Sequence, residues 1–478
     1  GRAYAVVQAL ETTFRDRSIL AERLNNLKRS GKVAEVVGEG VLPFTKTPIN
    51  ITKRSVEYSP IGLGKTFITE SGKLKRGVIT PSQFIDNTSK GLTGTGIFLL
   101  GMFLASLGIL RSGGPEKDKE GRFEDLQGEQ NYSINFGGHS YTLDWAAPAV
   151  IPLFSGAELV QSISARDGEF DFKAAVDSLT RLADPMMEMT MLQGLNSAIR
   201  AAGYEDNPLG AVGTNAVANY LTQGVPTMFG QIARTVDDTR RTVRIEPQSP
   251  LPTFLDRTLQ KTAIKLPGLS MTQQPYVNQW GQEEKNVGGN MAGRMAYNML
   301  SPGYYAKKTN DPVDKEIAKL YESTGDVSIL PSFAPKTFRN GKKEHSMTGD
   351  EYTRFAKDSG QVAHSTLEDL MGSKQYHMMT EEQKVKAIKD AYNYSKYYAG
   401  RGLFGGDYAH VSTYNPAAKM YAAKKKGVRV QDYIAFRQLR DGTTNASAQE
   451  ALDKTGMTSW QKAYVWSLEF PKSKNPYE

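Results

Sequence analysis

Residues 91–110 read GLTGTGIFLLGMFLASLGIL, and no charged side chain interrupts this run between Lys90 and Arg111. A helix that crosses a bilayer needs about 20 mostly apolar residues, so the run is just long enough. Its glycines and threonines, however, lower its hydrophobicity. Two interpretations therefore stay open: a helix buried at the centre of a protein assembly, or one that contacts a membrane during function.

The middle of this run predicts close contact with another helix. Gly101 and Ala105 are four residues apart, a spacing that lets two helix backbones approach each other. We therefore expect residues 91–111 to form a membrane or assembly helix. Its expected contact residues are Gly96, Leu99, Leu100, Gly101, Phe103, Leu104, Ala105 and Leu107.

Helix signals recur along the chain. Apolar residues within 2–36 follow a period close to 3.6, which is typical of an amphipathic helix. The pairs Thr348 and Glu351, and Thr380 and Gln383, have the spacing of capping boxes, which open helices. These signals predict a mainly α fold.

β structure is expected at one place. In YSINFGGHSYTLDW, residues 132–145, apolar and polar residues alternate on either side of Gly137 and Gly138. Adjacent glycines supply the positive φ angles that a tight hairpin turn requires. We expect a β-hairpin at about residues 131–146.

Glycine and proline are frequent, with 45 and 22 residues, which indicates long irregular stretches. The clearest is 245–310, expected to be an extended arm that lies on other surfaces and is broken by short helices. We therefore predict an elongated, multi-segment helical protein with long extended arms. Its expected segments are 1–90 (amphipathic, helical), 91–111 (apolar helix), 112–165 (loop and hairpin), 166–244 (helical), 245–310 (arm), 311–400 (helical) and 401–478 (basic, helical).

The formal net charge is +8, and it is unevenly placed. Residues 380–478 hold 16 Lys and Arg against 10 Asp and Glu, which gives +6. A basic end suits DNA, lipid headgroups or an acidic protein, although a solvated basic surface explains it equally well. The candidate anion-binding residues are Lys424, Lys425, Lys426 and Arg429.

No enzymatic motif is complete. The absence of cysteine excludes disulfides and thiolate metal sites. SPIGLGKT, residues 59–66, ends like a phosphate-binding loop, but Ser59 stands where that loop needs glycine. The five histidines lack metal-ligand spacing, and no strand followed by a Gly-x-Ser-x-Gly turn is found. We expect no enzyme, no catalytic residues, no cofactor and no metal.

Several blocks resemble a family of very large proteins of bacteriophages and mobile elements, the large polyvalent protein-associated domains. The blocks run in order over nearly the whole chain. They are LPFTKTPINITKRSVEYSPIGL (42–63), the apolar run ending in RSGGPEKDKE (111–120), YSINFGGHSYTLDW (132–145), KLPGLSMTQQPYVNQWG (265–281), DPVDKEIAKLYESTGDVSILP (311–331) and LEFPKSKNPYE (468–478).

This resemblance implies a protein packaged in the virion that enters the host with the DNA, and it supplies no catalytic residues. Because the chain starts at Gly1, we also expect it to be part of a longer precursor. The expected function is that of an internal virion or ejection protein. It would oligomerise at the portal or tail axis and help DNA pass through the host envelope.

The expected partners are copies of itself, portal or tail proteins, DNA and the host membrane. The expected location is the head interior or tail of the virion, and then the cell envelope on infection. Two alternatives stay open: a static minor protein of the phage head or tail, and a DNA-binding module of a mobile element.

Overall fold

A computed structural model describes residues 60–164 and 227–478, apart from 114–118, 147–149, 245–246, 248, 252, 341–342, 410–415, 441 and 443. The helix expected within 2–36 lies outside these residues. The chain divides into two compact units. The first comprises Gly1–Pro115, Gly128–Gly224 and Ser301–Lys308, and the second comprises Glu116–Gln127, Val225–Leu300 and Thr309–Glu478. The described residues are mostly helical, which confirms the mainly α prediction.

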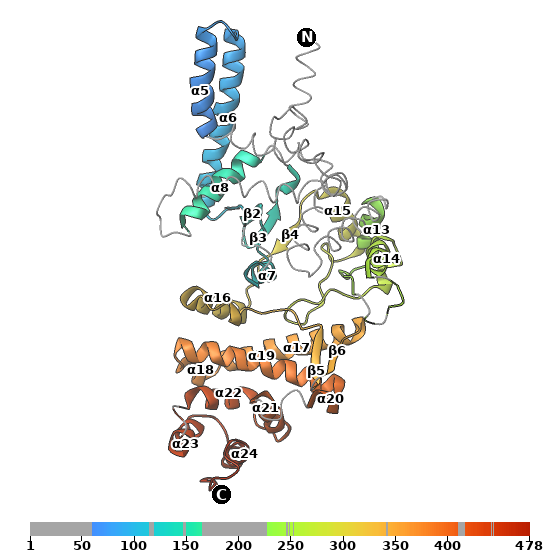
Figure 1. Cartoon of the computed structure of the whole chain (residues 1–478), viewed down its shortest axis with the longest axis vertical. Coiled ribbons are helices and arrows are strands. Elements are labelled where there is room, and N and C mark those ends of the chain that lie inside the picture. Colours follow the sequence, from blue (N-terminus) through green and yellow to red (C-terminus); the bar gives the residue numbers. More distant parts are fainter. Residues whose placement is uncertain are drawn as a thin grey trace, which may run out of the picture. The chain divides into compact units, whose positions relative to one another are not determined.

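The first unit is built on two long neighbouring helices, α5 (Pro60–Lys75) and α6 (Pro81–Ser106), which Figure 1 shows side by side. Thr80 caps α6: its hydroxyl accepts from the Gln83 backbone, and the Gln83 side chain accepts from the Thr80 backbone. The helix therefore starts ten residues before the expected position. The residues between this capping box and the apolar run are mostly polar, so the apolar run alone did not predict them as part of the helix. A third helix, α8 (Ile151–Ser164), packs across α6.

A small antiparallel sheet completes the first unit. Its strands lie in the order β1 (Leu110–Arg111), β2 (Ser133–Phe136), β3 (His139–Thr142) and β4 (Tyr305–Lys307), with η1 (Asp144–Ala146) after β3. The turn between β2 and β3 is formed by Gly137 and Gly138 at φ 59° and 78°, which confirms the predicted hairpin and its cause. The pairing of β4 with β3 was not foreseen, because β4 is very distant in sequence.

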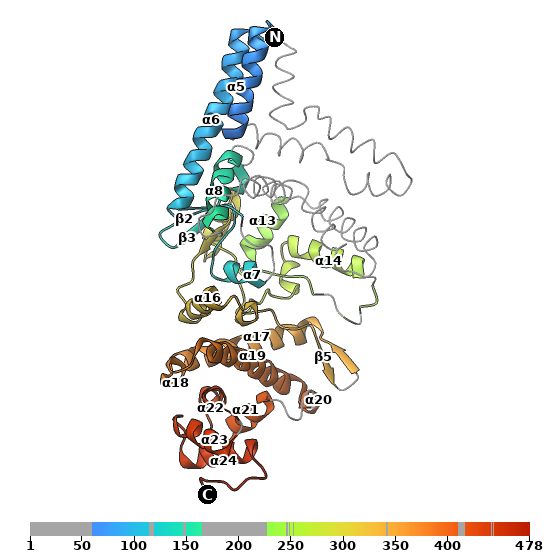
Figure 2. The ribbon, with the colours of Figure 1, turned by 60° about the vertical axis from the view of Figure 1, so that its left-hand side comes forward.

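The second unit is centred on α17 (Gly349–Met371) and α19 (Glu381–Phe404), which lie side by side in Figures 1 and 2. Both open on the capping boxes predicted at Thr348 and Thr380. Their apolar faces enclose a core with α16 (Pro312–Thr324), α22 (Val430–Leu439) and the last two helices. Its largest fully buried side chains include Leu367, Leu370, Tyr433, Phe436 and Trp466.

The remaining elements of the second unit are shorter. They are α7 (Lys119–Leu126), α13 (Thr227–Val236), α14 (Thr253–Lys265), η2 (Ser270–Thr272), α15 (Met291–Leu300), η3 (Val327–Ile329), β5 (Thr337–Asn340), β6 (Lys343–Ser346), α18 (Lys374–His377), α20 (Gly406–Ala409), α21 (Pro416–Lys425), α23 (Asn445–Asp453) and α24 (Ser459–Glu469).

Two sequence predictions need correction here. The first hairpin is accompanied by a second, β5 and β6, which was missed because Phe338 is the only large apolar residue in these two strands. The segment 245–310 contains the short helices expected within it, α14 and α15, but the residues between them form a loop that folds back on itself and is not extended. Bridges from Arg241 to Pro275 and from Val277 to Glu283 hold this loop, and Trp280 anchors it in the core at 4% exposure.

Candidate assembly surface

The crossing of α6 and α8 depends on two glycines. A Cβ on Gly101 would overlap the backbone carbonyl of Leu153, and one on Gly156 would overlap that of Phe98. Each helix therefore approaches the other at a point where it has no side chain. The close helix contact predicted from Gly101 exists, and its partner is α8 of the same chain.

The side of α6 that faces α8 belongs to a small core. Phe98, Leu110, Phe154 and Ala157 are buried in it, and residues packed against it include Met102, Leu104 and Ala105 of α6. The predicted contact residues Gly101, Leu104 and Ala105 thus serve the fold of the first unit.

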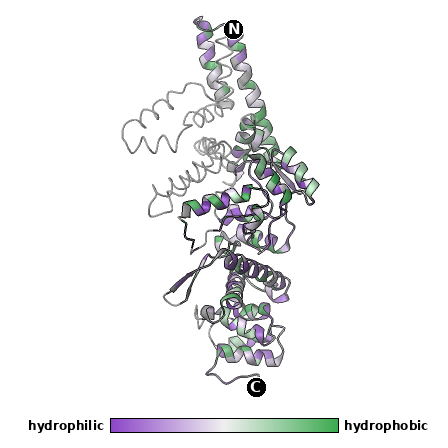
Figure 3. Cartoon of the chain, turned by 90° about the vertical axis from the view of Figure 1, so that its right-hand side faces the viewer, coloured by the Kyte–Doolittle hydropathy of each residue, from purple (hydrophilic) through white to green (hydrophobic). Residues whose placement is uncertain are grey.

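The opposite side of α6 is apolar and exposed. Six large side chains there are between 48% and 65% exposed: Ile85, Leu92, Leu99, Leu100, Phe103 and Leu107. At 100° per residue these positions fall within an arc of about 100°, so they form one continuous row. We call this row the α6 stripe, and Figure 3 shows hydrophobic residues recurring along this helix.

The α6 stripe has heptad spacing. Ile85, Leu92 and Leu99 are seven residues apart, and Ser89, Gly96 and Phe103 form a second row with the same spacing. Two such rows are what a coiled-coil seam presents to a partner helix. The seam also has room, because nothing lies within 4 Å of a Cβ built on Gly96.

Sequence reasoning placed Gly96, Leu99, Leu100, Phe103 and Leu107 in the assembly helix, and the structure puts them on this exposed side. It missed Ile85 and Leu92, which continue the row toward the start of the helix. Counting back in sevens from Leu99 would have found both. On α5, Phe67 and Ile68 are also exposed, at 55% and 75%.

Within the ranges that the structure describes, none of the helices combines the length and the apolar character that a membrane span requires.

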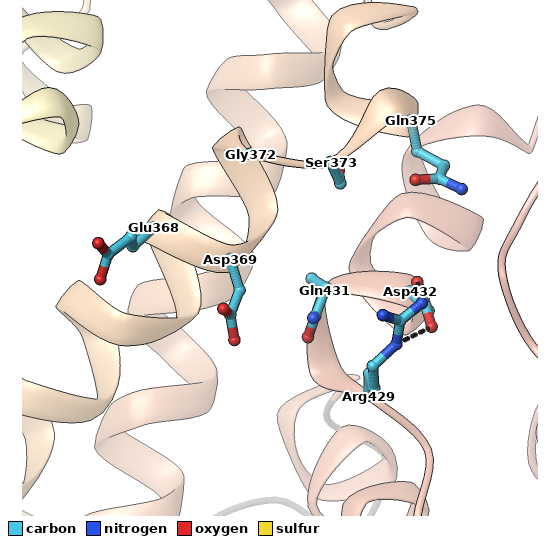
Figure 4. A pocket seen from close by; sticks show the side chains of 8 residues that line it. All are labelled: Glu368, Asp369, Gly372, Ser373, Gln375, Arg429, Gln431 and Asp432. Atoms are coloured by element: carbon cyan, nitrogen blue, oxygen red, sulfur yellow. Dashed lines mark hydrogen bonds and ion pairs between the residues drawn. The ribbon is translucent and has the colours of Figure 1, made fainter.

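The four predicted anion-binding residues do not share one pocket. Lys424 and Lys425 end α21, and the Lys425 ammonium lies 4.9 Å from the centre of the Tyr421 ring. Arg429 Nε donates to Asp432 at 2.8 Å. It lines a pocket of about 400 Å³ together with Glu368 and Asp369, shown in Figure 4, whose acidic lining repels anions.

Two carboxylates of the second unit, Asp311 and Asp314, have structural partners. Asp311 accepts from the backbone of Val313, which caps α16, and it also contacts His364 Nε2 at 2.8 Å. Trp280 Nε1 donates to Asp314 at 2.9 Å and so ties the folded-back loop to α16. In the part of the chain that is described, no group of three or more His, Asp or Glu side chains is placed to hold a metal ion.

No family model matches this chain, and no curated protein or solved structure shows a significant similarity to it.

Proposed function

We propose that this chain is an internal virion protein of a bacteriophage, which assembles with copies of itself through the α6 stripe and helps DNA pass through the host envelope. The phage assignment is supported by the sequence blocks that resemble large polyvalent protein-associated domains. The observation that carries the assembly role is the α6 stripe, because contiguous exposed apolar surface of this kind marks interaction sites.

A second copy of α6 is the occupant that suits this surface best. The stripe contains apolar residues at heptad spacing. The other residues of its seam are small, namely Ser89 and Gly96. Two identical stripes related by a twofold axis therefore place apolar side chains opposite one another, with room for close approach at Gly96. No charge would have to be buried at the seam.

The free energy at stake is large enough for assembly. Full burial of a large aliphatic or aromatic side chain contributes about 1.5–3 kcal/mol. The stripe residues are roughly half exposed, so each retains about 1 kcal/mol that contact with a partner would supply. Six such residues on each copy offset a substantial part of the entropy lost on association.

The test is the mass of the full chain in solution, measured by light scattering over a range of concentrations. Wild type is expected to self-associate. The double variant Leu92→Gln/Leu99→Gln should be monomeric at concentrations where wild type is not, because it places two polar amides in the seam.

The matched control is Leu269→Gln/Leu300→Gln, which makes the same chemical change at two leucines that are 50% and 80% exposed in the second unit. This control should keep the wild-type mass. A monomeric wild type, or identical self-association of the stripe variant, would refute assembly through α6.

A further inference from the structure

A second concave site lies within the second unit. It is a pocket of about 610 Å³ between α14, the start of α17 and the β5–β6 hairpin. Its lining includes the cations Arg244, Arg257, Lys261 and Lys336. None of the described residues that line it carries a carboxylate.

Arg244 is held in place from both ends. The side-chain amide of Gln260 accepts from the Arg244 backbone N–H and donates to its carbonyl oxygen, both at 2.8 Å. The guanidinium lies 4.1 Å from the centre of the Tyr352 ring, a cation–π contact on a side chain that is 4% exposed. The arginine is therefore preorganised at the pocket wall.

One donor of this arginine lacks an acceptor. Arg244 Nε is buried and makes no hydrogen bond within the described structure. A buried donor left unsatisfied costs about 1–3 kcal/mol, and native structures rarely keep one without a reason. An acceptor that enters the pocket would remove this cost.

The basic residues of α14 repeat once per turn. Arg257, Lys261 and Lys265 are each four residues apart, so their side chains follow one side of the helix. Burial lowers the pKa of Lys261, and repulsion from Arg257 and then Lys265 lowers it further. A bound anion would relieve this repulsion, so the field at the pocket favours negative charge.

The opposite wall adds polar groups and a helix terminus. Thr337 and Ser346 contribute hydroxyl-bearing residues from the hairpin, and Thr348 and Gly349 contribute the first turn of α17. The positive end of that helix dipole adds to the attraction for an anion already created by the four cations. The volume exceeds what a lone inorganic ion fills and lies in the range of small-molecule sites, about 300–1,000 Å³.

We propose that this pocket binds a small phosphorylated ligand through its phosphate group, with Arg244, Arg257, Lys261 and Lys336 as the groups that recognise the phosphate. Arginine forks match phosphate oxygens in geometry, and several cations together suit a ligand with more than one negative charge. A concave pocket suits a small phosphate ester better than duplex DNA, which is bound by an extended basic surface.

The experiment titrates sodium pyrophosphate into the full chain by isothermal calorimetry, with sodium chloride adjusted to hold the ionic strength constant. Wild type should bind. Arg257→Gln and Lys261→Gln should each weaken binding about tenfold or more, as expected for loss of one charge-assisted hydrogen bond.

The matched control is Lys424→Gln, which removes one positive charge at an exposed position outside the pocket. It should change pyrophosphate affinity by less than about twofold. Absence of pyrophosphate binding, or equal losses in Lys424→Gln and Arg257→Gln, would overturn the proposal. Binding of duplex DNA that depends on Arg257 in a chain that does not bind pyrophosphate would also overturn it and point to a nucleic-acid surface.

Discussion

Asp314 lies in an environment that is unfavourable to its charge. Asp314 is 2% exposed, and its carboxylate accepts a hydrogen bond from Trp280 Nε1. Burial raises the pKa of Asp314 to about 6, against the lowering effect of the hydrogen bond from Trp280. Nearby Asp311 raises this pKa further, and His364 lowers it.

The sign of the pH effect follows from this pKa. An aspartate that titrates near 6 in the fold and near 3.8 in the unfolded chain binds its proton more tightly when folded. Its protonation therefore stabilises the fold at low pH, and this stability is lost as the pH rises through about 6. At neutral pH the chain keeps a buried carboxylate at a net cost.

We expect Asp314→Asn to raise the free energy of unfolding of the second unit by about 1–2 kcal/mol near neutral pH, because Asn keeps an acceptor for Trp280 and removes the charge. The gain should shrink toward about pH 4, where the wild-type carboxyl is already protonated. Amide hydrogen exchange of α16 measures it locally. Asp311 and His364 stay unchanged in the variant.

Asp326 provides a control, because its substitution by asparagine should change the free energy of unfolding in the opposite direction. Hydrogen bonds from Lys389 and Ser328 lower the pKa of this carboxyl to about 2, so its ionised form stabilises the fold and Asp326→Asn should destabilise it at neutral pH. If both asparagine variants change stability in the same direction near neutral pH, burial of the Asp314 charge is not the cause.

At the scale of elements, glycine occurs in two different environments in α6. Gly101 lies where the α8 backbone leaves no space for a side chain, whereas Gly96 faces open space on the other side of the same helix. A glycine in a helix interior costs about 0.5–1 kcal/mol relative to alanine. Packing against α8 compensates the cost of Gly101, whereas no contact among the described residues compensates the cost of Gly96.

Alanine substitutions separate these roles. Gly101→Ala should destabilise the first unit by at least about 2 kcal/mol, because Leu153 and the rest of α8 must move away. Gly96→Ala should instead stabilise α6 by about 0.5–1 kcal/mol. Hydrogen exchange of α6 and α8 in the two variants measures both effects. Equal behaviour of the two variants would show that the helices do not cross at Gly101.

The elements that sequence reasoning found are those with local signals. Thr348 and Thr380 cap their helices through residues three positions away, and Gly137 begins the turn of the first hairpin. In each case the residues that determine the structure lie within one turn of the chain. Such signals can be interpreted without knowledge of the tertiary fold.

The features that were missed depend on distant partners. The sequence of α6 predicts close packing at Gly101 and apolar contact at Leu99. It does not predict which face of the helix packs inside the first unit and which face is exposed. That choice is made by α8, which begins at Ile151. The same limit applies to the pocket, since Arg244 and Lys336 approach α14 and α17 only through the tertiary fold.

For the whole molecule, apolar surface and positive charge are carried by different parts of the chain. The α6 stripe belongs to the first unit, whereas residues 380–478 of the second unit carry +6 of the net +8. A chain with these properties has two means of contact with a membrane whose lipids are anionic: apolar insertion by a half-exposed helix face, and electrostatic attraction of its basic end. Neither requires a helix to cross the bilayer.

The delivery role therefore predicts that the full chain floats with vesicles that contain anionic phospholipid. Leu100→Lys, at a stripe position that is 48% exposed, should abolish flotation, because a charge in the stripe prevents insertion of the apolar face even though it adds positive charge. Leu300→Lys makes the same change at an exposed leucine of α15 and should float like wild type.

If wild type stays in solution at every lipid composition, or if Leu100→Lys floats as wild type does, the stripe serves protein contacts alone. The proposal of a static minor protein of the phage head or tail then replaces that of an ejection protein.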